Sequence, residues 1–537
     1  MFVPRLLPAM LGASLLLGAC AGLPTERGRQ ALAADVAARG LALPEAPPDA
    51  ADPVAAWLGA PLSVDRAIQI ALLRNPELRA ETATLGLAAA EVYEAGRLAN
   101  PLLSATWLSR GDDPHAQLTL GIAVNFTDLL LLRSRARIAD AEFERTRLAI
   151  GGAALDLAAR VEAAYRRVVA AAQLAELRRA LAGHARTAAT LAQRYADAGN
   201  LPRRDLALEQ AAASEAELDA DADARDLALA RGALQRLLGL QADASWTLAE
   251  TLALPPADDE ALADLQRLAR DSRLDIAAAR RHVDALAARY GLTRRTRALG
   301  EIAIGAERER EYDGGVHGGP TLSLALPLFD WGAGRQARGA AERRAAEAEL
   351  AARTLDAERD VGAAYARLRT ARTRVERYRR DVLPARETAV EQTQREFNYM
   401  LVDAFELLTV RRQGNAAYAG YLEALGDYWV ARAELAGAVG RRLPLDGAAG
   451  PAALRFDDGR PRLVDAPPAA PANPHAHTRG DTQDEPAPMA ATEHRPDCAM
   501  QGMNMAAADA AAAHERMMAT CAGTAPAAQH GDHDGQH

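Results

Sequence analysis

Side chains that bind soft metal ions are concentrated near the C-terminal end of this 537-residue sequence. The last 63 residues hold seven of the eleven histidines, six of the nine methionines and two of the three cysteines. Thioether and thiolate sulfur favours Cu(I) and Ag(I), whereas imidazole also accepts Cu(II), nickel and zinc. A segment without a core gives methionine no packing role, so this composition predicts metal binding. The predicted ligands are His494, Cys498, Met500, Met503, Met505, His514, Met517, Met518, Cys521, His530, His533 and His537.

These ligands form two clusters, and neither has the stricter spacing of a zinc finger. Residues 498–505 place four sulfur atoms within eight residues, and residues 514–521 repeat such side chains at helical spacing. Two alternatives stay open, namely compositional drift and a disulfide between Cys498 and Cys521 in an oxidising compartment. We expect bound Cu(I) or Ag(I) to be auxiliary, with no cofactor required for the main function.

A pair of acidic residues, Asp403 and Glu406, is the second candidate site. Residues three apart on a helix share a face, and several copies around an axis would form rings of negative charge that attract cations. Arg411 and Arg412 follow about one turn later and could pair with these acids; a solvated helix face is the alternative. The sequence has no Ser/His/Asp set and no phosphate loop, so we expect no enzymatic activity.

The sequence that must position these residues is duplicated about 200 residues apart. Leu155-Asp156 and Ala163-Ala164-Tyr165 recur as Leu355-Asp356 and Ala363-Ala364-Tyr365. A weaker echo links 75–78 with 273–276, and 231–239 is echoed by 431–440. The unit is too long for a solenoid repeat, so we predict one pseudo-symmetric domain made of residues 63–250 and 251–445.

Very long helices dominate each copy. Residues 128–198 contain no proline and predict a helix of about 105 Å at 1.5 Å per residue. Residues 334–398 predict a similar helix, kinked at Pro384. Turns near 199–202 and 398–402 lead to return helices ending at Gly239 and Gly440. The composition, 49% apolar but 4% aromatic, suits long helices in contact, and the net charge of −9 disfavours a nucleic-acid partner.

Between the helices, each copy has two short segments with strand character, at 102–108 and 118–126 and at 302–306 and 321–328. Large apolar residues alternate with small or polar ones, which predicts strands with one face toward lipid. A buried hairpin is the alternative. Four strands cannot close a barrel, and lipid does not tolerate open edges, so several chains must share one barrel.

Both ends of the chain differ from this duplicated region. Residues 1–19 have the pattern of a signal peptide, and Leu17-Gly18-Ala19-Cys20 resembles a lipobox in which Cys20 becomes lipidated. An ordinary secretory signal is the alternative. Residues 20–62 are interpreted as an extended tether, and residues 446–537 as a disordered tail rich in His, Met and Cys.

Residues 63–440 together resemble the TolC family of outer-membrane efflux channels. The resemblance rests on the duplication, Asn75-Pro76-Glu77-Leu78, the strand pairs and the segment 397–408. It implies a mainly α fold with a small β part, in which a homotrimer builds a twelve-stranded barrel and a periplasmic helical tunnel. The implied location is the outer membrane, where a lipid anchor resembles the branch serving proton-driven pumps, including heavy-metal exporters.

The resemblance also assigns roles at the hairpin tips. The family's Val-Asp-x-x-Asp segment is matched by Val402-Asp403-Ala404-Phe405-Glu406, which implies that Asp403 and Glu406 gate the entrance. The docking surface for a periplasmic adaptor is expected at Gly199, Leu201, Tyr399, Met400 and Leu401. Plain turn chemistry is the alternative.

We therefore expect a passive outer-membrane conduit of a tripartite efflux system, most simply for copper or silver. A channel for drugs or other organic compounds, with an auxiliary metal-binding tail, is the alternative substrate class. Two other protein classes are alternatives: a periplasmic adaptor, which has one hairpin and compact β domains, and a copper-handling lipoprotein acting through its tail.

Overall fold

The computed structural model describes residues 28–44, 53–109, 111, 116–249, 251–256, 258–296 and 301–444, together with the backbone of 452–457 and 460–465. The chain divides into two units, Met1–Ala470 and Pro471–His537, and all described residues belong to the first. Cys20 and the candidate metal ligands from His494 to His537 lie outside the described residues, so lipidation and metal binding stay predictions.

The two halves of the first unit repeat one order of elements, as the duplicated sequence predicts. In the first half these are α4 (Val64–Arg74), α5 (Pro76–Ala95), β1 (Leu102–Leu108), β2 (Gln117–Asn125), α6 (Phe126–Asp197) and α7 (Arg203–Leu238). In the second they are α8 (Leu262–Ser272), α9 (Leu274–Arg295), β3 (Ile302–Arg310), β4 (Val316–Leu324), α10 (Ala333–Arg377), the π-helix η1 (Tyr378–Val382), α11 (Leu383–Asn398) and α12 (Ala404–Val439).

Equivalent junctions tie the start of each half to its last helix. The buried Asn75 caps α5 by accepting from the Leu78 amide at 3.0 Å, and its Nδ2 donates to the Leu237 carbonyl at 2.9 Å. At the matching junction, the Ser272 hydroxyl donates to the Val439 carbonyl at 2.7 Å. Both repeats therefore join the start of the half to the end of its last helix through a side-chain hydrogen bond.

The four strands form one antiparallel sheet in the order β1-β2-β3-β4. The predicted strands are present, but β3 extends to Arg310 and β4 spans Val316–Leu324 instead of the predicted 321–328. The segment Gly318-Gly319-Pro320 has low strand propensity, which concealed the start of β4. Pairing with β3 outweighs that propensity, and proline is tolerated because β4 is an edge strand of this sheet.

The two long helices differ in regularity. Helix α6 runs unbroken for 72 residues through Gly151, where a Cβ atom would lie 2.7 Å from Leu274 Cδ1, so this glycine permits close helix packing. The second long helix contains η1 just before Pro384. The predicted kink is thus one turn of π-helix, which accommodates a residue that cannot donate to the carbonyl four positions earlier.

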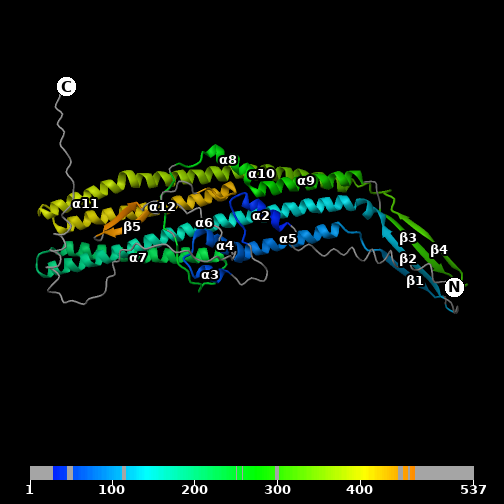
Figure 1. Ribbon diagram of the computed structural model, residues 1–537, viewed down its shortest axis with the longest axis horizontal. Helices are drawn as coiled ribbons and strands as arrows, with labels where there is room; N and C mark the ends of the chain where they lie inside the picture. The colour runs from blue at the N-terminus through cyan, green and yellow to red at the C-terminus, as the bar shows by residue number, and fades with distance from the viewer. Residues whose placement is uncertain are drawn as a thin grey trace, which may run out of the picture. The chain divides into compact units, whose positions relative to one another are not determined.

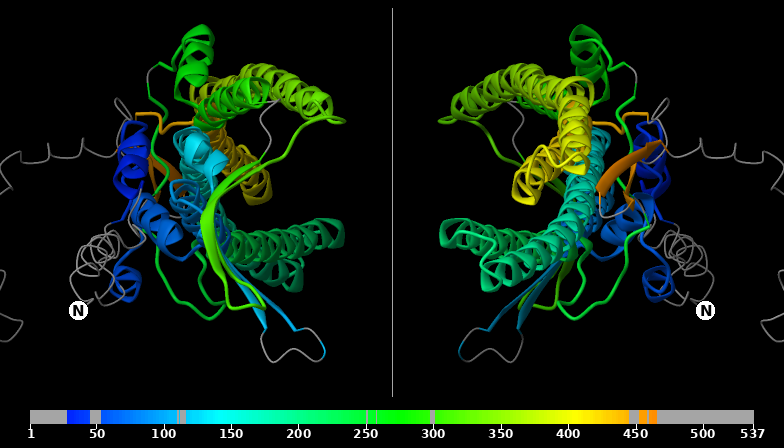
Figure 2. Two further views of the ribbon diagram at one scale, coloured as in Figure 1. Left: turned by 90° about the vertical axis from the view of Figure 1, so that its right-hand side faces the viewer. Right: turned by 90° about the vertical axis from the view of Figure 1, so that its left-hand side faces the viewer.

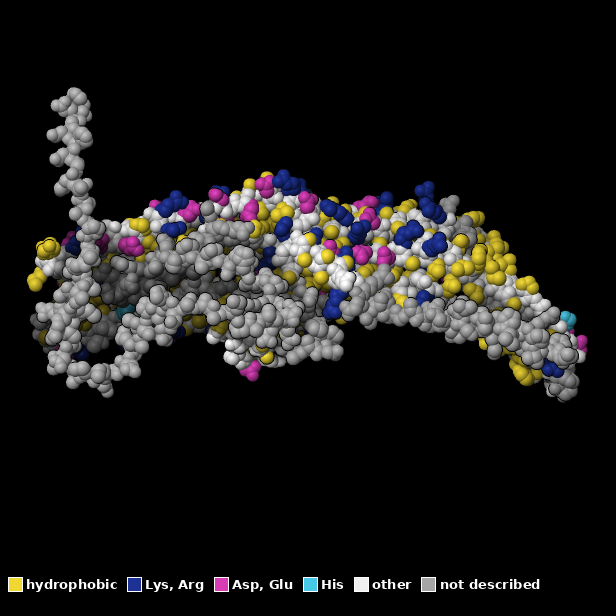
Figure 3. All heavy atoms as spheres, viewed as in Figure 1, with side chains coloured by type: hydrophobic (Ala, Val, Ile, Leu, Met, Phe, Trp, Pro, Cys, Tyr) yellow, Lys and Arg dark blue, Asp and Glu magenta, His cyan; other side chains and the backbone are white. Residues whose placement is uncertain are grey.

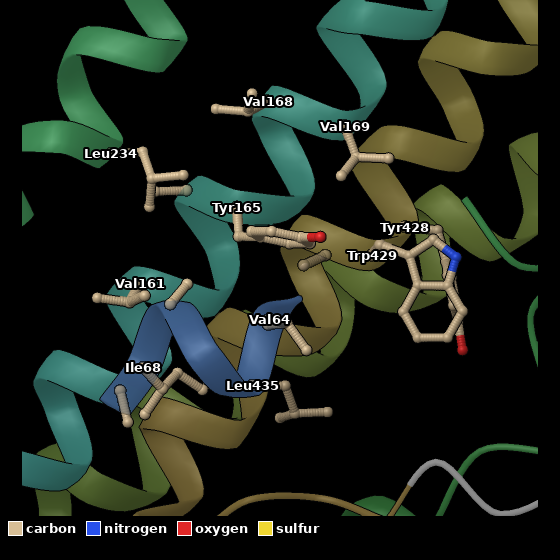
Figure 4. Packing of buried hydrophobic residues seen from close by; sticks show 14 of the residues in the cluster. Val64, Ile68, Val161, Tyr165, Val168, Val169, Leu234, Tyr428, Trp429 and Leu435 are labelled. Carbon is tan, nitrogen blue, oxygen red and sulfur yellow. The ribbon is translucent and has the colours of Figure 1, made fainter. Parts of the chain in front are cut away.

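The core lies where α4, α6, α7 and α12 meet (Figure 4). Tyr165 from the duplicated motif is fully buried there, and its hydroxyl donates to the Leu62 carbonyl at 2.7 Å. Leu62 also forms a parallel bridge with Leu248. Val161, Leu234 and Leu435 pack around this point. The segments that begin and end the first half, at Leu62 and Leu248, are thereby held against α6.

The sheet lies at one end of the first unit, and the α6–α7 and α11–α12 turns lie at the other (Figure 1). Viewed along the helices, α6 of the first hairpin lies beside α12 of the second (Figure 2). Among the described residues, no helix is long and apolar enough to cross a membrane.

Two predictions for the chain ends are wrong in part. The expected extended tether contains α2 (Arg29–Ala37) and α3 (Val54–Leu58), because Leu32 and Val36 are buried against α6. The expected disordered tail begins with a two-stranded antiparallel hairpin, β5 (Ala452–Asp457) and β6 (Arg460–Asp465). The intervening Asp458-Gly459 is a common hairpin-loop sequence, a signal that the alanine- and proline-rich composition obscured.

Candidate functional site

The first hairpin tip, between α6 and α7, is a compact glycine turn. Gly199 has a left-handed backbone with φ of 78°. Its amide donates to the Ala196 carbonyl at 2.9 Å, and the Asn200 amide donates to the Tyr195 carbonyl at 2.8 Å. Leu201 is half-buried beside it. The predicted docking residues of this tip therefore lie together, and Gly199 provides the turn.

The second tip has the same hydrogen-bond pattern without a glycine. The Met400 amide donates to Phe397 and the Leu401 amide to Glu396, both at 2.9 Å, and Met400 has φ of 59°. A side chain in this conformation costs about 1–2 kcal/mol. Tyr399, Met400 and Leu401 are 79%, 93% and 73% exposed. Backbone strain thus coincides with three projecting apolar side chains, which is typical of a binding surface.

Asp403 and Glu406 lie beside this tip, but not as two equivalent charges on one helix face. Asp403 is the N-cap of α12: its Oδ1 accepts from the Phe405 amide at 2.9 Å and the Glu406 amide at 2.8 Å. Glu406 stands in the first turn, where the helix dipole favours an acid. The D-x-x-E spacing resembles a capping box, a signal that sequence reasoning interpreted only as charge.

The expected pairing of the arginines with these acids is wrong for Arg412. Its Nη1 lies 3.0 and 2.8 Å from the two carboxylate oxygens of Glu209, a residue of α7 that is only 4% exposed. Arg411 donates to Gln394 of α11. Arg412 therefore links the first hairpin to the second. Sequence reasoning missed Glu209, because the two partners lie 203 residues apart.

The linked helices border a groove of about 600 Å³ between α6, α7 and α12. Leu181, Ala188 and Leu191 supply apolar surface, and Arg178 and Asp219 form an ion pair at 3.1 Å on its wall. Burial, together with repulsion from Asp219 and Asp226, raises the pKa of the neighbouring Asp223 above its ordinary value despite Arg178. The groove thus combines apolar surface with charged side chains of both signs.

At the opposite end, the sheet separates apolar from polar side chains. The residues exposed on one face include Leu103, Leu120, Ile122, Val124, Ile304 and Leu322. The other face holds Thr119, Gly121, Glu307 and Glu309, with Gln117 donating to Glu309. Hydrophobic side chains gather over this end in Figure 3. Such a sheet suits lipid on one side and water on the other.

Comparisons with known proteins agree with this geometry. A family model described as outer membrane efflux protein matches residues 265–441. Protein CyaE of Bordetella pertussis is 30% identical over 391 residues, which cover 67% of this chain and 81% of that protein. The chain belongs to the outer membrane efflux protein family. This membership places it among transport channels, in keeping with the expected lack of enzymatic activity.

Solved structures of outer-membrane channels share its fold. CusC superposes with a TM-score of 0.59 at 16% identity, covering 71% of this chain and 92% of CusC. The outer membrane protein VceC of Vibrio cholerae gives a TM-score of 0.59 at 17% identity, covering 70% and 96%. The predicted fold class, long helical hairpins with a four-stranded barrel contribution, is confirmed.

Proposed function

We propose that three copies of this chain form a passive outer-membrane channel that receives substrate from an inner-membrane pump through a periplasmic adaptor. The observation that carries the proposal is the position of the sheet. Its apolar face is exposed, and it lies at the opposite end of the first unit from the two hairpin tips. Such a protomer can place strands in lipid while its helices extend about 100 Å into the periplasm.

The strand count and the family support a trimer. Strands β1 and β4 are the edges of the described sheet, and each leaves a row of backbone groups without partners in it. Lipid cannot satisfy those groups, so a neighbouring copy must pair with them. Three four-stranded sheets close a barrel of twelve strands.

The gate would lie at the tips. Asp403 caps α12 and Glu406 occupies its first turn, so three copies would place a ring of carboxylates at the entrance. The adaptor would dock on Gly199 and Leu201 of the first tip and on Tyr399, Met400 and Leu401 of the second. The strained backbone at Met400 supports this assignment.

The proposed substrate is copper or silver. The support is the sulfur- and imidazole-rich sequence after residue 490, which would collect soft metal ions near the channel. Lipidation of Cys20 would hold the N-terminus in the membrane. An organic substrate is the second candidate, because the groove beside the hairpins offers apolar surface from Leu181, Ala188 and Leu191.

Electrical recording tests the channel directly. Detergent-extracted full-length protein should run as a trimer and conduct ions in planar bilayers. Replacing Asp403 and Glu406 together by alanine should reduce selectivity for cations while leaving conductance measurable. A monomer that leaves bilayers sealed would contradict the channel, whereas unchanged selectivity would contradict only the gate.

A truncated chain tests the substrate separately. Ending the chain after Pro444 should leave trimers and conductance intact but lower copper tolerance of a deletion strain carrying it. Copper binding by the purified truncated protein should fall in parallel. If the truncated protein binds as much copper as the full chain, the tail is not the metal site.

A further inference from the structure

Two arginines lie on the apolar face of the sheet. The strand register pairs Arg308 with Leu120 and Gly318, and Arg310 with Leu118 and Val316. Residues directly opposite in neighbouring strands have side chains on the same face. Arg308 and Arg310 therefore share the face of Ile122 and Ile304, whereas Glu307 and Glu309 of the same strand occupy the other face.

Neither arginine is neutralised by the described part of the chain. Both are exposed, and neither has an ion-pair or hydrogen-bond partner among the residues that the structure describes. Their cross-strand neighbours are glycine, valine and leucine, which offer no acceptor side chain. In the middle of a lipid-facing strand, an arginine costs about 2–4 kcal/mol, but near the membrane surface this falls to about 0–1 kcal/mol.

The position along the sheet places these arginines at a membrane boundary. From Val316, opposite Arg310, the chain reaches Leu326 in ten residues, which corresponds to about 33 Å when extended and about 25 Å along the normal at a tilt of about 40°. The chain then turns, because the Leu328 amide donates to the Leu326 carbonyl at 2.9 Å. Leu328, Phe329 and Trp331 are 66%, 100% and 61% exposed and mark the helix-side boundary. An apolar band of a barrel is about 25 Å tall, so Arg310 lies at the opposite boundary and Arg308 lies two residues inside it.

An aromatic residue occurs at the same level. Trp107 is 70% exposed and pairs with Leu118, which in turn pairs with Arg310, so the three side chains form one row across the sheet. Tryptophan is enriched where hydrocarbon meets headgroups. Guanidinium groups bind phosphate with two parallel hydrogen bonds. This row therefore combines an interfacial anchor with a cation that fits a phosphate.

We propose that Arg308 and Arg310 bind the phosphate groups of a phosphorylated glycolipid in the outer leaflet. The inference rests on the proposed channel, because the channel's orientation puts this end of the sheet at the outer surface. Charge complementarity selects the ligand. The apolar face of β3 carries Arg308 and Arg310 and no acid, whereas the two glutamates of this strand lie on the other face.

Lipid retention tests the assignment. Full-length trimers are purified in neutral detergent with lipid A as the probe, and retained lipid is measured by mass spectrometry. Each basic residue near an anionic surface contributes about a fivefold effect, so R308Q with R310Q should weaken retention about thirtyfold. R308K with R310K keeps both charges but loses the paired hydrogen bonds, so its retention should lie between that of the double glutamine variant and that of the unchanged protein. Arg203→Gln, which changes an exposed arginine at the first hairpin tip, is the matched control and should equal the unchanged protein.

Several outcomes would overturn the inference while leaving the channel intact. These are conducting R308Q/R310Q trimers with unchanged lipid A retention, equal retention of phosphorylated and dephosphorylated lipid A, and an equal loss in the Arg203→Gln control. If the double variant does not assemble, R308Q and R310Q are measured singly, each with an expected fivefold loss. Failure of the unchanged protein to form conducting trimers would instead refute the proposed function.

Discussion

Replacing Arg412 by glutamine removes the cation that faces a buried carboxylate between the two hairpins. The side chain of Glu209 is 5% exposed and that of Arg412 is 39% exposed. Two unit charges about 4 Å apart interact by about 4 kcal/mol at an effective dielectric constant of about 20, and by about 1 kcal/mol in water. Because solvent reaches the guanidinium, we expect a coupling of about 1–2 kcal/mol.

The loss should act on the channel entrance, because this contact joins α7 to α12 near the tips. A change of about 1–2 kcal/mol corresponds to about a 5- to 30-fold shift in the ratio of open to closed channels. Single-channel recordings of R412Q, E209Q and the double variant give this ratio and the coupling energy directly. Arg374→Gln is the control, since Arg374 pairs with Asp427 at 2.7 Å between α10 and α12, with both side chains about half exposed.

Two results would contradict this role of Arg412. If R412Q shifts the open-to-closed ratio by less than about twofold and the double-mutant cycle gives less than about 0.3 kcal/mol, the contact does not hold the hairpins together. An effect of R374Q equal to that of R412Q would show that any interhelical ion pair suffices. Either result refutes the reasoning from burial.

Three further changes test other parts of the structure. Met400→Gly should relieve the strain of the left-handed backbone and stabilise the second hairpin tip by about 1 kcal/mol, measured by hydrogen exchange. The same change should weaken binding of the periplasmic adaptor, and unchanged binding contradicts docking at this tip. Asp259→Asn should cost about 3–5 kcal/mol in denaturant unfolding, because this carboxylate is 4% exposed and binds Arg372 at 2.9 Å; a loss below about 1 kcal/mol contradicts this. Burial favours a raised pKa for Asp275, but Arg273 outweighs burial and holds the pKa below its ordinary value. The contribution of Asp275 to folding stability is therefore full above about pH 4 and is lost as the pH falls further. Asp275→Asn should flatten the acid side of the profile of unfolding free energy against pH, and an unchanged profile excludes this contribution.

Most of the fold could be predicted because the signals were long and periodic. Helix α6, the alternating residues of β2 and the duplicated Tyr165 motif each appear in one stretch of sequence. The start of β4 could not be predicted from local propensity, because Gly318-Gly319-Pro320 forms a strand only when β3 is beside it. Helix α2 was missed for the same kind of reason, since burial of Leu32 and Val36 depends on α6.

The candidate site could be predicted only in its local part. The tip residues were found because turns have sequence signatures, and both tips lie where expected. The capping role of Asp403 was present in the spacing to Glu406 but was interpreted as charge alone. The partner of Arg412 depends on how two separate hairpins align, and no local pattern contains that alignment.

The π-turn at Tyr378–Val382 makes the two hairpins of one protomer mechanically unequal. Helices α6 and α7 are regular α-helix from end to end, whereas α10 passes into α11 through a wider and less regular turn. Three protomers with two hairpins each would form a ring of six hairpins, in which stiffer and more flexible hairpins alternate. In the proposed trimer, that ring would widen most at its three π-interrupted hairpins, so its aperture would take a triangular outline.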